Sequence, residues 1–265
     1  MHPFDQAIEL TERDQGLHGE APLAYWNMVG PYGGITAAIV MAAVMRDPRR
    51  EAEPLALTVN YCAPVQRGPY EIERSLVRTN RSTQHWRVEM IQTDPKTGEP
   101  MVVVQAMAVF GARRDLWSGR AAKPPTAASP EGLARRRGSD EIAWFQRYDI
   151  RFDRHPFKSP PDEPVLHWVR DDPPRPLDSI ALASLCDTFF PTLFARRQTV
   201  VPVATVSMNI YFHVGAAELA AVGDAWLLGE GRSNAYHRGF FDAEARLWHG
   251  EQLLATTHQV MWYRQ

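Results

Sequence analysis

The sequence predicts an α+β fold made of two tandem units, each with a central helix wrapped by an antiparallel sheet. Three observations lead to this prediction. A pattern of one apolar helix followed by four strands occurs twice along the 265 residues. A proline-rich stretch, residues 111–176, separates the two occurrences. Matching residues in the two copies are related by a nearly constant offset, as expected of an internal duplication.

The first unit contains a predicted helix from about Ile35 to Met45, directly after Gly33 and Gly34. Apolar residues surround this helix almost completely, so it is expected to be buried rather than half exposed. Alternating apolar and polar residues then predict four antiparallel strands. These strands are Pro54–Ala63, Tyr70–Thr79, His85–Thr93 and Met101–Phe110.

The proline-rich stretch is too dense in proline to form a continuous helix or a central strand. Within it, Ile142–Phe152 and Val165–Val169 have the aromatic and β-branched content that is typical of strands. We therefore predict an N-terminal unit over residues 1–112, a Pro/Arg-rich linker over residues 113–140 and a C-terminal unit over residues 141–265.

The second unit opens with Leu177–Ser179, which has the residue types of a helix N-cap. An apolar helix is predicted from there to about Phe194. Four more strand patterns follow, and they span Val200–Phe212, Asp224–Gly231, Ala235–Ala245 and Gln252–Tyr263.

The alignment of the two copies depends on three pairs of matching residues. They are Asn60 with Asn209 (209 − 60 = 149), Arg81 with Arg232 (232 − 81 = 151) and Glu99 with Glu251 (251 − 99 = 152). An antiparallel sheet that follows one apolar helix can bury that helix by curling around it, which is the hotdog fold. Two such units in one chain form a double hotdog, and pairing of their sheet edges leaves no exposed edge between them.

Composition narrows the classes of partner. Apolar residues make up 45% of the chain, charged residues 23%, and the formal net charge is −2. These values are ordinary for a globular protein and predict neither a nucleic-acid nor a membrane partner. Cys62 and Cys186 lie in apolar segments and are expected to be reduced core residues. With no signal-peptide pattern and no apolar stretch long enough to span a bilayer, a cytoplasmic location is expected.

Several kinds of site are excluded by missing motifs. The chain has no CxxC pair for a structural zinc, no GxSxG serine elbow and no glycine-rich phosphate loop. We therefore expect no metal and no cofactor.

The two copies differ where chemistry could occur. When the two copies are aligned by these offsets, Ala56 corresponds to Thr205 and Met107 corresponds to Gln259. The second copy therefore has hydrogen-bonding residues where the first copy is apolar. Asp187 lies in an apolar helix pattern, where a carboxylate is costly unless it is paired or reactive. Each residue also has an ordinary interpretation. Asp187 could cap a second helical segment after a break, and the other two could be plain strand residues.

The order and spacing of these features resemble the type II acyl-CoA thioesterases, a family of tandem double hotdogs. That family places an aspartate on the central helix, a threonine early in the next long strand and a glutamine in the final strand. The segments that carry the resemblance are residues 182–187, 203–208 and 254–259 in the second unit, and residues 32–34, 64–68 and 78–85 in the first. The chain departs from the family in the strand over residues 55–62, where the usual histidines and aromatics are absent before Tyr61.

The resemblance implies hydrolysis of an acyl-CoA by Asp187, Thr205 and Gln259. Asp187 would activate a water as general base, and the other two residues would hold that water. Backbone N–H groups at a helix N-terminus, which Gly33 and Gly34 leave accessible, would stabilise the oxyanion. The same two glycines could equally serve only a tight turn.

The resemblance also implies where the rest of the substrate lies. Arg81 and Arg232, in matching Arg-Ser turns, are candidates for binding the CoA phosphates, with Arg87 and Arg238 as further candidates. The acyl chain is expected in an apolar tunnel between the units, near Phe189, Phe190 and Trp262. A homodimer of double-hotdog chains is expected by analogy.

Two other functions remain open at this stage. A hotdog dehydratase or hydratase would need a catalytic histidine, and His213 and His258 are the available strand histidines. Alternatively, the protein could bind acyl-CoA without turnover or act as a scaffold, since a fold alone does not establish activity.

Overall fold

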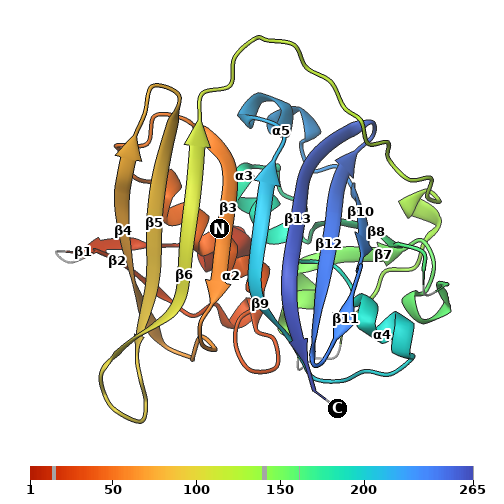
Figure 1. Ribbon diagram of the computed structural model, residues 1–265, viewed down its shortest axis with the longest axis horizontal. Helices are drawn as coiled ribbons and strands as arrows, with labels where there is room; N and C mark the ends of the chain where they lie inside the picture. Colours follow the sequence, from red (N-terminus) through yellow and green to blue (C-terminus); the bar gives the residue numbers. More distant parts are fainter. Residues whose placement is uncertain (14–15, 139–141, 161, 265) are drawn as a thin grey trace.

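The computed structural model describes all residues except 14–15, 139–141, 161 and 265. In this part of the chain, thirteen strands form one antiparallel sheet with the order β1-β2-β4-β5-β6-β3-β9-β13-β12-β10-β8-β7, and β11 pairs with β12 (Figure 1). The strands are β1 Thr11–Arg13, β2 Gly16–Glu20, β3 Glu53–Tyr61, β4 Pro69–Thr79, β5 Thr83–Thr93, β6 Pro100–Gly111, β7 Tyr148–Phe152, β8 Val165–Asp171, β9 Val203–Phe212, β10 Leu227–Arg232, β11 Tyr236–His237, β12 Phe240–His249 and β13 Gln252–Tyr263. The predicted α+β fold with a central helix in each of two units is confirmed.

Helices α2 and α3 lie on one side of this sheet, behind its central strands in Figure 1. The helices of the described chain are α1 Pro3–Ala7, α2 Gly33–Met45, α3 Ser179–Leu185, α4 Thr192–Arg197 and α5 Ala216–Val222, with 3-10 turns at Leu23–Tyr25, Pro130–Gly132, Ala143–Arg147 and Pro156–Lys158. Helix α2 is buried at every residue from Gly34 to Val44, as its apolar pattern predicts. We call the side that carries α2 and α3 the inner face of the sheet, and the other side the outer face.

A pair of equivalent hydrogen bonds marks the junction of the two units, where β3 pairs with β9. The Thr58 hydroxyl donates to Asn209 Oδ1 at 2.7 Å, and the Ser207 hydroxyl donates to Asn60 Oδ1 at 2.9 Å. The offset of 149 turns one contact into the other, because 58 + 149 = 207 and 60 + 149 = 209. The junction therefore has approximate twofold symmetry, which is what a duplicated unit produces.

The strand register corrects one pair of the alignment. Val59 pairs with Ala106, and its counterpart Met208 pairs with Gln259. The counterpart of Gln259 is therefore Ala106, with an offset of 259 − 106 = 153, and not Met107. Met107 is 57% exposed on the outer face, whereas Gln259 is buried on the inner face. The predicted offset of 152 comes from glutamates in turns of unequal length, and such turns do not set the register of the strands.

The helix of the second unit is shorter than predicted. It begins after Asp178, whose carboxylate caps two backbone N–H groups as expected. It ends at Leu185 and not near Phe194, because the Thr188 hydroxyl donates to the carbonyl oxygen of Leu185 at 2.8 Å and closes the helix end. Asp187 therefore lies in the turn after α3 and not inside a helix.

Two predicted strands also differ in extent. The strand predicted over Ile142–Phe152 begins only at β7, because Ala143–Arg147 forms 3-10 turns that place aromatic rings against the first unit. The strand predicted over Ala235–Ala245 is interrupted after β11. Arg238 and Gly239 adopt positive φ angles of 46° and 89°, which turn the chain before β12 begins.

Cys62 and Cys186 are both free, but only Cys186 is buried; the prediction that Cys62 is a core residue was wrong.

The N-terminal residues were not assigned any element from the sequence, yet they bridge the units. Helix α1 packs near the second unit, where His2 Nε2 donates to the carbonyl oxygen of Pro173 at 2.8 Å and Asp5 pairs with Arg175 at 2.9 Å. The predicted boundary between residues 140 and 141 lies outside the described residues. Among the helices of the described chain, none is long and apolar enough to cross a membrane.

Candidate active site

Asp187 lies against the N-terminal end of the first unit's helix. A β-carbon on Gly33 would lie 2.8 Å from Asp187 Oδ2, and one on Gly34 would overlap the carbonyl oxygen of Ser184. The backbone N–H of Gly34 donates to the Asp187 carboxylate. Glycine at both positions therefore allows the start of α2, with its partial positive charge, to approach the carboxylate closely.

Asp187, Thr205 and Gln259 form one chain of hydrogen bonds. Gln259 Nε2 donates to Asp187 Oδ1 at 2.8 Å, and the Thr205 hydroxyl donates to Gln259 Oε1 at 2.9 Å. A carboxylate can only accept, so the amide nitrogen of Gln259 faces Asp187 and its oxygen faces Thr205. Gln259 is 5% exposed, while the other two residues are partly exposed. The three residues singled out from the sequence are thus in contact.

A β-bulge at Val206 brings Thr205 to this side of the sheet. Val260 and Met261 of β13 pair with Ser207 and Thr205 of β9, which leaves Val206 as the extra residue. Regular alternation along β9 would put Thr205 on the outer face together with Ser207. The bulge reverses the alternation at that point, so the Thr205 hydroxyl reaches Gln259 on the inner face.

Burial changes the acidity of the Asp187 carboxyl group. It raises the pKa of Asp187 from 3.8 to about 7, while hydrogen bonds from Gln259 and from the Gly34 backbone act in the opposite direction. Asp187 therefore gains and loses its proton near neutral pH. A carboxylate of this kind is suited to accept a proton from water.

Tyr61, at the end of β3, is a neighbour of Asp187 that the sequence did not single out for the site. Its hydroxyl donates to the carbonyl oxygen of Gly33 at 2.8 Å and lies 3.2 Å from the position of a Gly33 β-carbon. Burial, followed by the charge of Asp187, holds the pKa of Tyr61 well above its usual range. An aromatic residue at a strand end resembles any core residue in sequence, and only its place beside the aligned Asn60 could have drawn notice.

The structure does not bring Arg81 to this site. Its turn joins β4 to β5 at the end of the sheet where β3 begins, since Gly111 pairs with both Thr83 and Glu53. Tyr61, beside Asp187, is at the other end of β3. The eight steps along the strand from Glu53 to Tyr61 correspond to about 26 Å. Arg81 therefore makes no contact with Asp187, and its role in binding the CoA phosphates stays a prediction.

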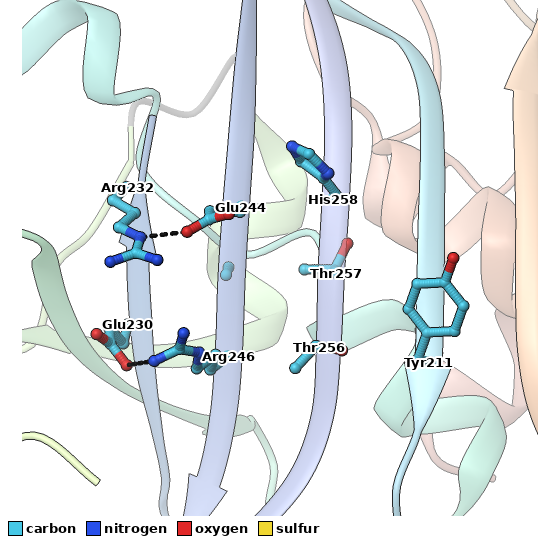
Figure 2. A pocket seen from close by; sticks show the side chains of 9 residues that line it. Tyr211, Glu230, Arg232, Glu244, Arg246, Thr256, Thr257 and His258 are labelled. Carbon is cyan, nitrogen blue, oxygen red and sulfur yellow. Dashed lines mark hydrogen bonds and ion pairs between the residues drawn. The ribbon is translucent and has the colours of Figure 1, made fainter. Parts of the chain in front are cut away.

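Arg232 lies on the opposite side of the sheet from Asp187. Its guanidinium pairs with Glu244 in a shallow outer-face cavity of about 220 Å³, where Arg246 pairs with Glu230 at 3.6 Å (Figure 2). His258 lies on the same face, next to Glu244 in the strand pairing. The charges in this cavity are paired with each other, and no contact connects them with the three hydrogen-bonded residues.

The two histidines considered for a hydratase, His213 and His258, also face outward. His258 lies 3.3 Å from Asp242 and is largely exposed, and His213 lies 3.1 Å from the hydroxyl of Thr256 and is exposed. Neither ring contacts the chain of hydrogen bonds at Asp187. The described residues contain no cluster of three or more histidine, cysteine or acidic side chains that could hold a metal ion.

The expected acyl-chain residues separate into two groups. Trp262 pairs with Phe240, which is 54% exposed, so Trp262 lies on the outer face and the expectation for this residue was wrong. Phe189 and Phe190 follow Asp187 after one intervening residue, Thr188, and are partly buried. Phe189 packs over Gly231, where a β-carbon would lie 3.0 Å from its ring.

Two family models, both of acyl-CoA thioesterase domains, match the sequence. A family model described as the acyl-CoA thioesterase N-terminal domain matches residues 23–111, and one described as the acyl-CoA thioesterase C-terminal domain matches residues 121–263. No curated protein matches the sequence significantly.

Solved structures with similar folds cover nearly the whole chain. A conserved hot dog-fold protein of unknown function from Alicyclobacillus acidocaldarius is 41% identical, covers 100% of this chain and 99% of its own, and has a TM-score of 0.94. The acyl-CoA thioesterase II TesB2 of Mycobacterium marinum is 21% identical, with 98% of each chain covered and a TM-score of 0.75. A tesB protein of Mycobacterium avium subs paratuberculosis is 22% identical, covers 99% of this chain and 98% of its own, and has a TM-score of 0.78.

Proposed function

The chain belongs to the acyl-CoA thioesterase family, and on this basis we propose that it hydrolyses an acyl-CoA thioester to the free acid and CoA. Asp187 is the general base, and Thr205 and Gln259 orient it and the attacking water. The observation that carries the proposal is the chain of hydrogen bonds from Thr205 through Gln259 to the carboxylate of Asp187. Burial raises the pKa of this carboxyl group to about 7.

The proposed reaction has two steps. Asp187 takes a proton from water while the water oxygen attacks the thioester carbonyl carbon. The negative charge on the carbonyl oxygen is stabilised by the N-terminal turn of α2, next to Gly33. The intermediate then breaks its carbon–sulfur bond, and the protonated Asp187 returns the proton to the departing CoA thiolate. The bonded trio holds the reacting groups in place before reaction, which reduces the entropy lost at the barrier.

The first unit supports the reaction without supplying the base. It provides the start of α2 and the Tyr61 hydroxyl that holds the carbonyl oxygen of Gly33. In the strand pairing, Ala106 corresponds to Gln259, and Leu57, which pairs with Ala108, corresponds to Thr205, which pairs with Met261. Both first-unit residues are apolar, so the predicted match of Thr205 with Ala56 is corrected to Leu57, and these positions of the first unit form no equivalent chain of hydrogen bonds in the described structure.

A hydratase that uses His213 or His258 is disfavoured by the placement of these two residues. His213 and His258 lie on the outer face, with partners of their own, and neither contacts Asp187. Binding without turnover has no observation in its favour beyond the divergence of the first unit.

The assay is release of free thiol from a panel of acyl-CoAs by the purified protein, with enoyl-CoA hydration measured in parallel. We expect hydrolysis of at least one acyl-CoA and no hydration. Hydration without thiol release would support the hydratase, and tight acyl-CoA binding with no release would support the binding protein.

The unit boundaries at residues 112/113 and 140/141, the homodimer, and the cytoplasmic location stay predictions.

A further inference from the structure

The two sides of Asp187 are packed differently. On the side of the first unit, α2 is fully buried, and Gly34 contacts both Ser184 and the ring of Tyr32. On the side of the second unit, the helix stops at Leu185 and the chain continues without regular structure to α4. The sheet beyond Asp187 is therefore covered by side chains and not by a continuous helix.

Small side chains line the inner face of the sheet on that side. Ala243 pairs with Gln259, and in the next row Thr257, Ala245 and Gly231 lie opposite one another across β13, β12 and β10. This row spans two strand spacings, or about 10 Å. We call Thr257, Ala245 and Gly231 the small-residue floor.

One polar atom on this floor lacks a partner. The Thr257 hydroxyl is buried, Thr257 is 4% exposed, and within the described structure this hydroxyl makes no hydrogen bond. Almost all buried polar groups in proteins are paired, and the thioester carbonyl or a water is the kind of group that could pair this hydroxyl; the hydrocarbon part of an acyl chain could not.

Phe189 closes the far end of the floor. Its Cδ1 lies 3.0 Å from the position of a β-carbon on Gly231, so only glycine lets the ring rest there. The ring also packs edge-on against His167 with centroids 5.0 Å apart. His167 is fully buried, which lowers its pKa to about 4 and keeps it uncharged beside the aromatic ring. Phe189 itself stays partly exposed.

We infer that Phe189 is the end wall of the acyl pocket and that it restricts this enzyme to short acyl chains. This inference rests on the proposed thioester hydrolysis at Asp187. The acyl chain extends from Gln259 along the small-residue floor and meets the Phe189 ring above Gly231. Each additional buried methylene adds binding energy only while the pocket has room for it.

The experiment compares kcat/KM for butyryl-, octanoyl- and palmitoyl-CoA in the wild type and in three variants. Phe189→Ala should raise the palmitoyl-to-butyryl ratio at least about tenfold, because it removes the end wall. Ala245→Val should lower the octanoyl-to-butyryl ratio by a similar factor, because it narrows the floor. Phe157→Ala is the matched control, since Phe157 is also partly buried but packs against Phe190, and it should leave both ratios within about twofold.

The inference is overturned if the palmitoyl-to-butyryl ratio of kcat/KM in Phe189→Ala stays within about twofold of the wild-type ratio, whatever the thermal stability of the variant. The wild-type protein separates this outcome from failure of the proposed function. If it hydrolyses no acyl-CoA, the proposed function fails, and the same ratios are then taken from dissociation constants for the three acyl-CoAs. In that case, ratios of dissociation constants that are unchanged in Phe189→Ala and Ala245→Val would overturn the inference that Phe189 forms the end wall.

Discussion

Gln259 Nε2 donates a hydrogen bond of 2.8 Å to Asp187 Oδ1 across the inside of the second unit, from the last strand of the chain to the turn after α3. This contact links residues 72 positions apart in sequence. It depends on the break that ends α3 at Leu185, because a helix continuing through Asp187 would change the direction of its side chain.

The pH dependence of hydrolysis follows from the acidity of Asp187. A general base works only when it is deprotonated, and burial raises the pKa of Asp187 to about 7. We expect kcat/KM to rise with pH and to level off above a midpoint near pH 7. Steady-state rates between pH 5 and 9 measure this, and a flat profile across pH 7 would argue against Asp187 as the base.

The same pKa predicts how stability depends on pH. The folded protein binds the Asp187 proton more tightly than the unfolded chain, whose carboxyl has the ordinary value of 3.8. The free energy of unfolding contributed by this group therefore falls as pH rises from about 4 to about 7 and is constant above that. An asparagine at position 187 does not titrate in this range and leaves no charge to be buried at high pH, so the Tm of Asp187→Asn should exceed the wild-type Tm by at least about 3 °C at pH 8.

The difference in Tm between these two proteins should vanish near pH 4. Asp171, whose pKa is also raised to about 7 by burial, is present in both proteins and cancels in the difference. Differential scanning calorimetry at pH 4, 6 and 8 tests the prediction. A Tm difference that does not change with pH would mean that Asp187 does not titrate near neutrality.

Thr205 is predicted to act through Gln259. Thr205→Val and Gln259→Leu should each reduce kcat/KM at least about tenfold, and the double variant should lose little more than Gln259→Leu alone, because the two side chains share one chain of hydrogen bonds. Thr256→Val, which removes a hydroxyl from the outer face, is the control and should stay within about twofold of the wild type. Fully additive losses would show that Thr205 acts independently.

The junction between the units predicts two equal losses of stability. Asn60→Ala removes the acceptor of the Ser207 hydroxyl, and Asn209→Ala removes the acceptor of the Thr58 hydroxyl. Each should lower the free energy of unfolding by about 1 kcal/mol and leave kcat/KM within about twofold. Urea denaturation measures both values, and losses that differ by more than about 1 kcal/mol would be inconsistent with a symmetric junction.

The internal duplication allowed most strands to be predicted within a few residues, because buried strands and a buried helix leave strong patterns in sequence. The break after Leu185 could not be predicted, since residues 186–190 continue the apolar pattern and the break depends on the Thr188 hydroxyl. The bulge at Val206 has no sequence signal either, although it alone brings Thr205 to the inner face. Register between distant strands is a tertiary property, and for this reason the first-unit counterpart of Gln259 was misplaced by one residue.

The candidate site could be predicted only where chemistry and duplication coincided. Asp187, Thr205 and Gln259 stood out because the first copy is apolar at the aligned strand positions. Arg81 and Arg232 matched each other equally well, but their match reflects equivalent turns in the two units. Tyr61 and the Gly34 backbone contact depend on how α2 packs against the turn after α3, which no local pattern encodes.

The most direct test of the account is the hydrolysis of a short acyl-CoA by Asp187→Asn, measured beside the wild type at pH 8. This substitution keeps the shape of the side chain and its bond from Gln259 but removes the base. The account predicts thiol release by the wild type and a loss of about a thousandfold in kcat/KM in a variant that remains folded. Wild-type activity that survives in Asp187→Asn would contradict it.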